Sequence, residues 1–533
     1  MDSGDEAMSR DFNPRIMPAP RHLPLALPEQ YPYVDGAAVE ANQTYRADVC
    51  IVGSGAGGGS LAYYLTELGL KVIVLESGPA TFTQTYSQEP ARAYLQLYQE
   101  FGVLTTDLPP FLPIMGAEAL GGSTVVNSGL CFRPEAYVMD DWRRQSGVDW
   151  FNRDLLDPDL AWVENYLMVA PGREDALGRH NTITRDAAEK LGWRGAVARR
   201  NAPGCIGCGV CYYGCPSGGK RSVDTSYLSD AAAMGLQIVT RAKVDKLMRD
   251  HTGAVTQVSG RFMTIDKNPR SVGFAVEAPV VVMAAGAVGT PSLLLRNGFD
   301  NEHIGKHWHI HPGAGLSAWF WHEEIRQWDG ITQGYYIDEF IREGILMEVA
   351  SVPTEAISAA FTAPGPAGLE AMRKLRHMAT LGGMIHDRTE GWFKLLPGGT
   401  IVRRYELIDS DIALMQRSVN LMAQLYSAVG ASEYQVSING APAARSVTEV
   451  ASQVARATRP EDWVLYCSHP QSTARMNVDP RLGAVGPDFR LHGTPNLYVA
   501  DASIFADSLG VNPQITIMAL ARRCARQIAH GKA

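Results

Sequence analysis

Apolar residues near the start of the chain follow the pattern of one strand–helix–strand unit. Residues 48–52 form a short apolar run, a glycine-rich segment follows, and residues 60–68 have helical periodicity. A second apolar run over residues 71–75 ends at Glu76. Apolar runs of this length between turn residues are typical of strands that are covered on both faces. The pattern therefore predicts a βαβ unit with two parallel strands.

Later apolar runs predict that distant parts of the chain complete the same sheet. Strands are expected over residues 237–244 and 278–285, both returning to the first sheet. Another strand is expected over residues 496–500, and a helix over residues 514–528 follows it. Because a long stretch of different character separates these segments, we expect the first domain to be discontinuous.

The middle of the chain has that different pattern. From residue 313 to residue 461 glycine motifs are few, stretches such as 330–337 alternate between apolar and polar positions, and residues 411–428 have helical periodicity. Two shorter helices are expected before this region, over residues 155–166 and 184–191. These features predict a second domain that is inserted into the first.

Composition and charge narrow the functional class. The 533 residues are 46% hydrophobic and 20% charged, with a net charge of −8. A negative net charge without a long Lys/Arg run argues against a surface that binds nucleic acid. No stretch of about 18 apolar residues is present, so no transmembrane helix is expected, and residues 1–32 lack the apolar core of a signal peptide. We therefore expect an enzyme that is cytoplasmic or peripheral to a membrane.

Gly53, Gly55 and Gly58 fit the G-x-G-x-x-G pattern of a dinucleotide-binding turn. The turn follows a predicted strand and opens a predicted helix, and Glu76 ends the next strand, which is the context that the pattern requires. The glycines let the backbone approach a pyrophosphate, to which the helix N-terminus offers free N–H groups, and Glu76 would accept hydrogen bonds from ribose hydroxyls. A glycine turn without a ligand is the alternative, and these residues do not separate FAD from NAD.

Two residues near the C-terminus, His469 and Asn512, are candidate catalytic residues. Oxidation of an alcohol needs a group that handles the hydroxyl proton and an acceptor for the hydride. A histidine titrates near neutral pH, an asparagine amide can hold a developing alkoxide by donating N–H, and a flavin can accept the hydride. A single histidine is more often a core residue, so this assignment depends on the wider pattern.

Four of the eight cysteines lie in one short run, which has the C-x2-C-x2-C-x3-C-P spacing of bacterial ferredoxins. Its members are Cys205, Cys208, Cys211 and Cys215. The run predicts an iron–sulfur cluster, held either by three cysteines as a three-iron cluster or by all four. Disulfides, free thiols that form a structural knot, and another metal are the alternatives, although a tetrathiolate zinc site usually brings two separated C-x2-C pairs. The other four cysteines are expected in the apolar interior.

Together these motifs resemble the glucose-methanol-choline (GMC) oxidoreductase family over nearly the whole chain, from Asp48 to Arg526. Residues 121–127 resemble the first signature of the family and residues 285–295 resemble the second. The segment His386-Asp387-Arg388-Thr389-Glu390-Gly391 and the cysteine run are similar to the long-chain alcohol oxidases within the family.

The resemblance implies an α/β fold, with a discontinuous Rossmann-like FAD-binding domain and a substrate domain of antiparallel sheet plus helices. The implied division is an N-terminal arm (1–44), the first part of the FAD domain (45–140), a cap and cysteine-rich region (141–235), the second part of the FAD domain (236–312), the substrate domain (313–461) and a C-terminal FAD-binding and catalytic part (462–533).

By the same resemblance, His469 and Asn512 form the catalytic pair, and the FAD contacts can be assigned by position. These contacts are Gly53, Gly55, Ala56, Gly58, Glu76, Ser77, Gly122, Ser123, Asn127, Val244, Asp501, Ala502, Gln514 and Ile515. Asp501 and Ala502 would approach the pyrophosphate or the ribityl chain of FAD, and Gln514 and Ile515 would approach its ring.

The implied reaction is FAD-dependent oxidation of an alcohol to an aldehyde or ketone. Apolar stretches over residues 344–352 and 356–361 suit a hydrophobic alcohol, long-chain or sterol-like, but they suit a core strand and helix as well. Oxygen, a quinone and a cytochrome are the candidate electron acceptors, and a membrane surface or a small subunit is a candidate partner. The alternatives are a sugar- or polyol-type dehydrogenase that passes electrons through an iron–sulfur cluster to a cytochrome, and a non-catalytic flavoprotein subunit.

Overall fold

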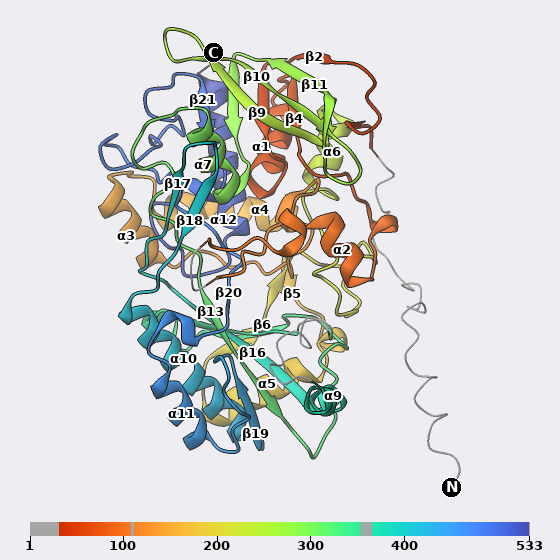
Figure 1. Ribbon diagram of the computed structural model, residues 1–533, viewed down its shortest axis with the longest axis vertical. Helices are drawn as coiled ribbons and strands as arrows, with labels where there is room; N and C mark the ends of the chain where they lie inside the picture. The colour runs from red at the N-terminus through yellow and green to blue at the C-terminus, as the bar shows by residue number, and fades with distance from the viewer. Residues whose placement is uncertain (1–30, 108–110, 352–353, 355–364, 532–533) are drawn as a thin grey trace.

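Two β-sheets, one parallel and one antiparallel, organise the protein, and they lie in the upper and lower parts of Figure 1. The structure is a computed structural model, and it describes residues 31–107, 111–351, 354 and 365–531. Residues 1–30 of the expected N-terminal arm and the apolar stretch 356–361 therefore lie outside the described residues.

The upper sheet has six parallel strands, in the order β1-β8-β4-β3-β12-β21. Their bounds are β1 Val34–Asp35, β8 Gln237–Thr240, β4 Val72–Leu75, β3 Val49–Val52, β12 Val280–Met283 and β21 Leu497–Val499. Every residue of β3, β4, β12 and β21 is buried. The continuous apolar runs in the sequence thus correspond to strands with both faces covered.

Helices and a second, smaller sheet provide this cover. Helix α1, Ala56–Glu67, packs on β3 and β4, and it is itself contacted by α6, Tyr227–Ala233, and α12, Gln514–His530. A four-stranded sheet in the order β2-β11-β10-β9 contacts the parallel sheet through β4 and β12. Its strands are β2 Gln43–Arg46, β9 Ala242–Arg249, β10 Val255–Met263 and β11 Pro269–Glu277. The result is a layered α/β domain built from strands that are far apart in the sequence.

The strand expected over residues 237–244 is two strands, and only the first returns to the parallel sheet. The chain breaks at Arg241, which has a left-handed backbone with φ +49°. Its guanidinium lies 2.5 Å from the carboxylate of Asp35, and its N–H donates to Gly78 O. The contacts hold a conformation that non-glycine residues seldom adopt, and β9 leaves to pair with β10 instead.

The lower sheet is antiparallel, in the order β19-β13-β16-β15-β14-β6, with β20 also paired to β13. Its strands are β6 Gly195–Val197, β13 Gly313–Trp319, β14 Tyr335–Ile337, β15 Ile345–Val349, β16 Met378–Ile385, β19 Glu433–Val436 and β20 Leu465–Tyr466. Helices α10, Asp409–Ala428, and α5, Arg179–Leu191, pack on this sheet, and α11, Val447–Arg456, packs on α10.

The alternating stretch over residues 330–337 forms a strand only in its last part, β14. Its first residue, Gly330, has φ +125° and bridges to Cys208, and its N–H donates to Gly207 O. The beginning of the stretch therefore packs against the cysteine run and not against a strand of the sheet. Residues 345–349, within the apolar stretch 344–352, form the core strand β15.

Helix boundaries differ from the expected ones mainly at the N-terminal ends. Helix α1 begins at Ala56 and not at residue 60, since three glycines of its first turn weaken the helical signal. Helix α4, Arg153–Tyr166, begins after Asn152, whose side chain accepts from the N–H groups of Asp154 and Leu155. The remaining helices and strands are α2 Pro90–Leu97, α3 Ala136–Ser146, α7 Gly286–Arg296, α9 Pro366–Arg373, β5 Ala170–Pro171, β7 Arg199–Arg200, β17 Trp392–Leu395 and β18 Ile401–Arg404.

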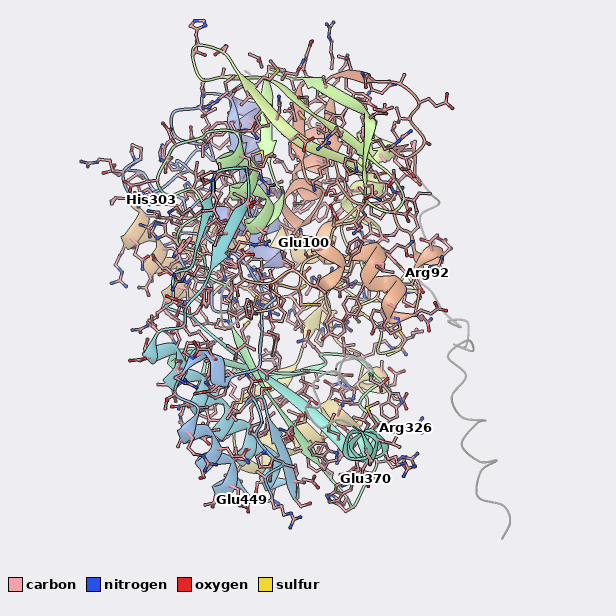
Figure 2. The ribbon with its side chains drawn as sticks, viewed as in Figure 1. Arg92, Glu100, His303, Arg326, Glu370 and Glu449 are labelled. Atoms are coloured by element: carbon pink, nitrogen blue, oxygen red, sulfur yellow. The ribbon has the colours of Figure 1, made fainter. Side chains whose placement is uncertain are left out.

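Charged side chains cover the outside of both parts. Arg92, Glu100, Arg326, Glu370 and Glu449 are all exposed, and Figure 2 labels them. Among the described helices, none combines the length and the apolar composition that crossing a membrane requires.

Candidate active site

The glycine turn between β3 and α1 has one position, Gly55, at which a Cβ would not clash with the rest of the protein. A Cβ at Gly57 would lie 1.7 Å from Ala500 O, and a Cβ at Gly58 would lie 2.0 Å from Gly53 O. A Cβ at Gly55 would meet nothing nearer than the Cα of Gly122, at 3.8 Å. Protein packing thus explains the other glycines of the turn, whereas Gly55 has room for a Cβ, and its bare backbone leaves the N-terminus of α1 approachable by a ligand.

Glu76 lies directly after β4 and is buried. Its Oε2 accepts from Ser54 Oγ at 2.5 Å and from Ser54 N at 3.1 Å, and its Oε1 accepts from Gly78 N at 2.9 Å and from Ser77 Oγ at 3.4 Å. Burial raises the pKa of this carboxyl, against the lowering effect of Ser54 and Gly78. Because Ser54 Oγ also accepts from Gly121 N, Glu76 ties the glycine turn to the segment that contains Gly122.

Asn127 and Gln514 meet beyond this segment. Asn127 Nδ2 donates to Gln514 Oε1 at 3.0 Å, and Gln514 Nε2 donates to Leu130 O at 2.6 Å. Gln514 is the first residue of α12, so the pair lies at a helix N-terminus, a place that favours negative charge. Ile515, the next residue, has its side chain fully buried in the core.

Other residues that the family resemblance assigns to FAD form hydrogen bonds within the protein or lie in its helices and strands. The carboxylate of Asp501 accepts from Gly286 N, Thr290 Oγ1 and Ser503 N, so it fixes the N-terminus of α7. Ala502 O accepts from Ser472 N. Ser123 Oγ accepts from Ala117 N, Val244 lies in β9, and Ala56 opens α1.

His469 and the loop that carries Asn512 meet at a third residue, His311. Nδ1 of His311 lies 3.3 Å from Nδ1 of His469, and Nε2 of His311 accepts from Gly510 N at 2.9 Å. Burial lowers the pKa of His469 to about 4, although Asp387 acts to raise it. His469 is therefore neutral near pH 7. Asn512 is buried, and its Oδ1 has no hydrogen-bond partner among the residues that the structure describes.

The hydrogen bonds of His311 determine which nitrogen of His469 carries its proton. Gln471 Oε1 accepts from Leu509 N, so the Gln471 amide presents its Nε2 to His311 Nε2, at 2.8 Å. Two donors at Nε2 leave the proton of neutral His311 on Nδ1, which faces His469. His469 accepts there and carries its own proton on Nε2.

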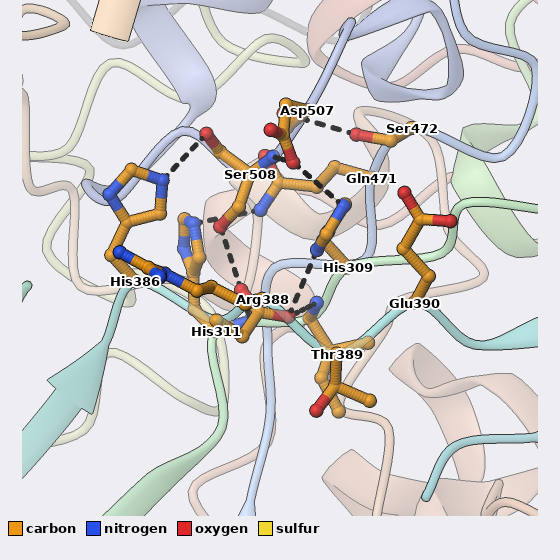
Figure 3. A network of polar contacts seen from close by, with 12 residues as sticks. His309, His311, His386, Arg388, Thr389, Glu390, Gln471, Ser472, Asp507 and Ser508 are labelled. Carbon is orange, nitrogen blue, oxygen red and sulfur yellow. Dashed lines mark hydrogen bonds and ion pairs between the residues drawn. The ribbon is translucent and has the colours of Figure 1, made fainter. Parts of the chain in front are cut away.

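A network of charged residues, formed by His309, Asp387 and Asp507, lies next to His311 (Figure 3). Nε2 of His309 lies 2.9 Å from Asp507, and its Nδ1 lies 3.5 Å from Asp387. Burial lowers the pKa of His309, but the two carboxylates outweigh burial and raise it overall. Asp387 also accepts from Tyr405 Oη at 2.6 Å, from Ser508 Oγ at 2.7 Å and from the backbone of Ile310 at 3.0 Å.

Glu348 is a residue of this site that the sequence analysis missed. It lies in β15, is buried, and accepts from Gln333 Nε2 at 3.1 Å through Oε2. Burial raises its pKa to about 7, while the nearby amides of Asn512 and Gln333 lower it. Its Oε1 has no partner in the described part of the chain. A single acid within the apolar run of residues 345–349 was the signal that could have identified it.

The four cysteines of the run line one cavity, together with Arg200 and Lys220. None of them forms a disulfide. Nη1 of Arg200 donates to Cys205 Sγ at 3.3 Å and Nη2 donates to Cys211 Sγ at 3.4 Å. Burial raises the pKa of the Cys211 thiol, but Arg200 and Lys220 outweigh it and lower the pKa overall. Among the described residues, no three His, Cys, Asp or Glu side chains are arranged to hold a metal ion.

Comparison with known proteins finds similarity over most of the chain. A family model for GMC oxidoreductase matches residues 94–313 and a second one matches residues 400–521, while a model for an NAD(P)-binding Rossmann-like domain matches residues 51–99. An uncharacterised GMC-type oxidoreductase of Mycobacterium tuberculosis is 36% identical over 485 residues, which cover 90% of this chain and 76% of that protein.

Three further proteins that the chain resembles have names that state an activity. A long-chain-alcohol oxidase of Arabidopsis thaliana is 28% identical over 505 residues, which cover 89% of this chain and 66% of that protein. Among solved structures, pyridoxine 4-oxidase from Mesorbium loti has a TM-score of 0.68 at 18% identity, covering 91% of this chain and 99% of that one. A formate oxidase of Aspergillus oryzae has a TM-score of 0.68 at 15% identity, with coverage of 92% and 99%. At these identities the solved structures establish the fold.

Proposed function

This chain belongs to the GMC oxidoreductase family, and from that premise we propose that it uses FAD to oxidise an alcohol to an aldehyde or ketone. The family, the α/β fold and the class of enzyme that the motifs implied are confirmed. One observation carries the proposed chemistry: His469 and the Gly510–Asn512 loop converge on His311 beside the N-terminus of α12.

The residues around the glycine turn fit FAD. At Gly55 and Gly122 no side chain covers the backbone, so a pyrophosphate could lie close to it, and the N-terminus of α1 supplies N–H groups. Glu76 would hold the ribose, and Asn127 with Gln514 would border the flavin ring. When bound, the flavin supplies the acceptor for the hydride that leaves the alcohol carbon.

His469 and Asn512 would hold the hydroxyl group of the alcohol. Because the proton of His469 is on Nε2, the ring would donate to the alcohol oxygen and share that hydrogen bond as negative charge develops there. The amide N–H of Asn512, a buried residue, would donate to the same oxygen and stabilise the negative charge that develops there. This arrangement aligns the carbon-bound hydrogen for transfer.

The hydroxyl proton also needs an acceptor. Neutral His469 already carries a proton on Nε2, and its pKa of about 4 makes it a weak base. Glu348, beside Asn512, has a pKa of about 7 and a carboxylate oxygen without a partner in the described residues. A group with a pKa near the working pH is suited to proton transfer, so Glu348 would take the proton.

A long-chain or sterol-like alcohol is the first substrate class to test, with oxygen as the acceptor. Support comes from the relatives that are named long-chain-alcohol oxidases. A second candidate, a dehydrogenase for sugars or polyols that passes electrons through an iron–sulfur cluster to a cytochrome, is favoured only by the spacing of the four cysteines in the sequence.

The catalytic pair can be tested by the rate at which alcohols bleach the flavin under anaerobic conditions. His469→Ala should slow flavin reduction on the order of 10²–10⁴-fold, and Asn512→Ala on the order of 10²–10³-fold. His469→Gln offers a donor but no base, so it should keep more activity than His469→Ala. Wild-type rates in both alanine variants would show that the pair is wrongly assigned. A His469→Gln variant as slow as His469→Ala would show that donation is not the role of His469.

A further inference from the structure

The four cysteines of the run line a small cavity that has no role in the chemistry proposed above. Its volume of about 20 Å³ is enough for one molecule of about the size of water. Gly207, Gly209 and Gly214 have left-handed backbones and turn the chain around this space. All four cysteines are partly exposed, and none of them forms a disulfide. Small molecules from solution can therefore reach sulfur here.

One of the four, Cys211, is held as a thiolate by Arg200. The guanidinium of Arg200 is buried and donates to two sulfurs, Cys205 Sγ at 3.3 Å and Cys211 Sγ at 3.4 Å. A buried guanidinium keeps its charge and needs a negative partner, which the Cys211 thiolate provides. Burial raises the pKa of this thiol, but Arg200 and Lys220 outweigh burial and lower the pKa overall.

Cys208 lines the same cavity and shows the opposite behaviour. Burial, together with the neighbouring Cys211 thiolate, raises the pKa of Cys208 to about 12, so it stays protonated at neutral pH. The thiolate and not the thiol is the nucleophile, and reactive cysteines lie in partly exposed, positively charged surroundings. Cys211 is thus the thiol of this pair that is prepared to react.

Two groups beside Cys211 can stabilise negative charge on an oxygen atom. The hydroxyl of Thr332 hydrogen-bonds to Cys211 and lies 3.0 Å from the hydroxyl of Ser128. Nη2 of Arg200 lies on the same sulfur. An O–H donor and a charged N–H donor therefore surround one thiolate, and such donors stabilise charge that develops on a leaving oxygen. This arrangement suits attack by the sulfur on an O–O bond.

We propose that Cys211 reduces hydrogen peroxide and that Cys205 then forms a disulfide with it. The Cys211 thiolate bonds to one peroxide oxygen and becomes a sulfenic acid as the O–O bond breaks. The other oxygen leaves as hydroxide, which takes up a solvent proton and becomes water. The Cys205 thiol then displaces the sulfenic oxygen as a second water. A dithiol from solution reduces the disulfide and completes the cycle.

The geometry selects both the second cysteine and the peroxide. Cys205 and Cys211 lie on neighbouring arms of one guanidinium. The chain between them contains two left-handed glycines, Gly207 and Gly209, whose turns let the sulfurs approach to the about 2.05 Å of a disulfide. The small cavity admits hydrogen peroxide, but it has no space for the organic group of a bulky hydroperoxide.

The source of the peroxide is an inference that rests on the proposed FAD-dependent function. With oxygen as the acceptor, the two electrons from each alcohol yield one hydrogen peroxide. Arg200 Nε donates to Ser128 O and Lys220 Nζ donates to Asn127 O, both at 2.7 Å. Asn127 would border the flavin ring. The cavity therefore adjoins the backbone segment beside which peroxide would form, and Cys211 would consume it there.

The thiol chemistry can be tested without alcohol, by adding hydrogen peroxide to FAD-loaded protein with reduced thiols. About two thiols per chain should be lost for each peroxide consumed, and peptide mapping should find Cys205 joined to Cys211. Cys205→Ser should stop at the sulfenic acid, which dimedone labels on Cys211. The matched control Cys208→Ser, which changes another cysteine of the same cavity, should form the disulfide at the wild-type rate.

The role of Arg200 can be separated from a structural one by pH. A thiol with an ordinary pKa of about 8.5 is only about 3% thiolate at pH 7. Arg200→Gln should therefore react with peroxide on the order of 30-fold more slowly at pH 7, and the difference should narrow above about pH 9. Equal slowing at every pH would show that Arg200 only supports the fold.

Four results would overturn the proposal. They are a Cys211 thiol that survives excess peroxide, equal oxidation of all four cysteines, iron bound to the sulfurs of the purified protein, and cumene hydroperoxide reacting as fast as hydrogen peroxide. A disulfide between Cys211 and Cys215 would overturn the role of Cys205.

A second arm links the site to alcohol oxidation. An active alcohol in the presence of oxygen should produce the same disulfide, and added catalase should prevent it. If added peroxide forms the disulfide but no alcohol reduces the flavin, the proposed function fails while the thiol chemistry stands. If alcohol reduces the flavin but peroxide leaves Cys211 unchanged, the thiol chemistry fails alone.

Discussion

Replacing Asp387 with asparagine should destabilise the protein by removing one charge from a buried network. The carboxylate is fully buried, and it lies 3.5 Å from Nδ1 of His309. Asparagine fits the same space, and its oxygen can still accept from Tyr405 and the backbone of Ile310. Its NH2 group then faces Ser508, whose hydroxyl can accept as well as donate. Few hydrogen bonds are lost, so the main loss is the counter-charge of His309.

Removing one partner of a buried ion pair costs about 3–5 kcal/mol. Because Asp507 remains 2.9 Å from the other nitrogen of His309, we expect Asp387→Asn to lower the free energy of unfolding by about 3 kcal/mol. The matched control is Asp507→Asn, which removes the other carboxylate of the same histidine. The side chain of Asp507 is 33% exposed, so solvent screens its charge and the loss should be at most about 1 kcal/mol.

The measurement is unfolding in guanidinium chloride at saturating FAD, followed by tryptophan fluorescence. The pKa of His309 is raised on folding, so its contribution is lost as pH rises through that raised value. The pKa of Asp387 is lowered on folding, so its contribution is lost as pH falls below about 4. The gap between wild type and Asp387→Asn should therefore be widest between about pH 4 and neutrality. Equal midpoints for the two proteins at pH 6 would refute the reasoning.

Two other substitutions test the site directly. Gly55→Ala should fold normally, because a Cβ there has no contact closer than 3.8 Å, yet it should lose FAD affinity; undiminished affinity by titration would contradict a pyrophosphate at this turn. Glu348→Gln should slow flavin reduction on the order of 10²–10⁴-fold and abolish its dependence on pH. In the wild type the rate should rise as Glu348 loses its proton around its pKa of about 7, and a Glu348→Gln variant that keeps this rise would exclude Glu348 as the base.

The parts of the fold that could be predicted were those with a strong local pattern. The runs that became β3 and β4 are buried on both faces, so their apolar residues are continuous and easily recognised. The break at Arg241 had no such signal, because it depends on contacts with Asp35 and Gly78 that the sequence does not place nearby. The early start of α1 was hidden by glycines that serve the turn.

In the candidate site, too, some features could be predicted from the sequence and others depend on contacts between distant residues. His469 and Asn512 could be assigned because a family resemblance marks their positions, and these assignments stay predictions. The tautomer of His469 could not be derived from sequence, since it follows from the donors that Gln471 and Gly510 direct at His311. Glu348 was missed because its role depends on the strand β15 reaching the Asn512 loop, which no local pattern encodes.

The strand order of the parallel sheet has a consequence for synthesis of the chain. Strand β3 ends at residue 52, whereas β21, the edge strand that covers β12, begins at residue 497. At about 5–20 residues per second, a ribosome needs roughly 20–90 s to make the intervening chain. Throughout that time one apolar strand edge has no partner, and such edges pair readily with other chains. The nascent protein therefore depends on protection of this edge until β21, Leu497–Val499, has been synthesised.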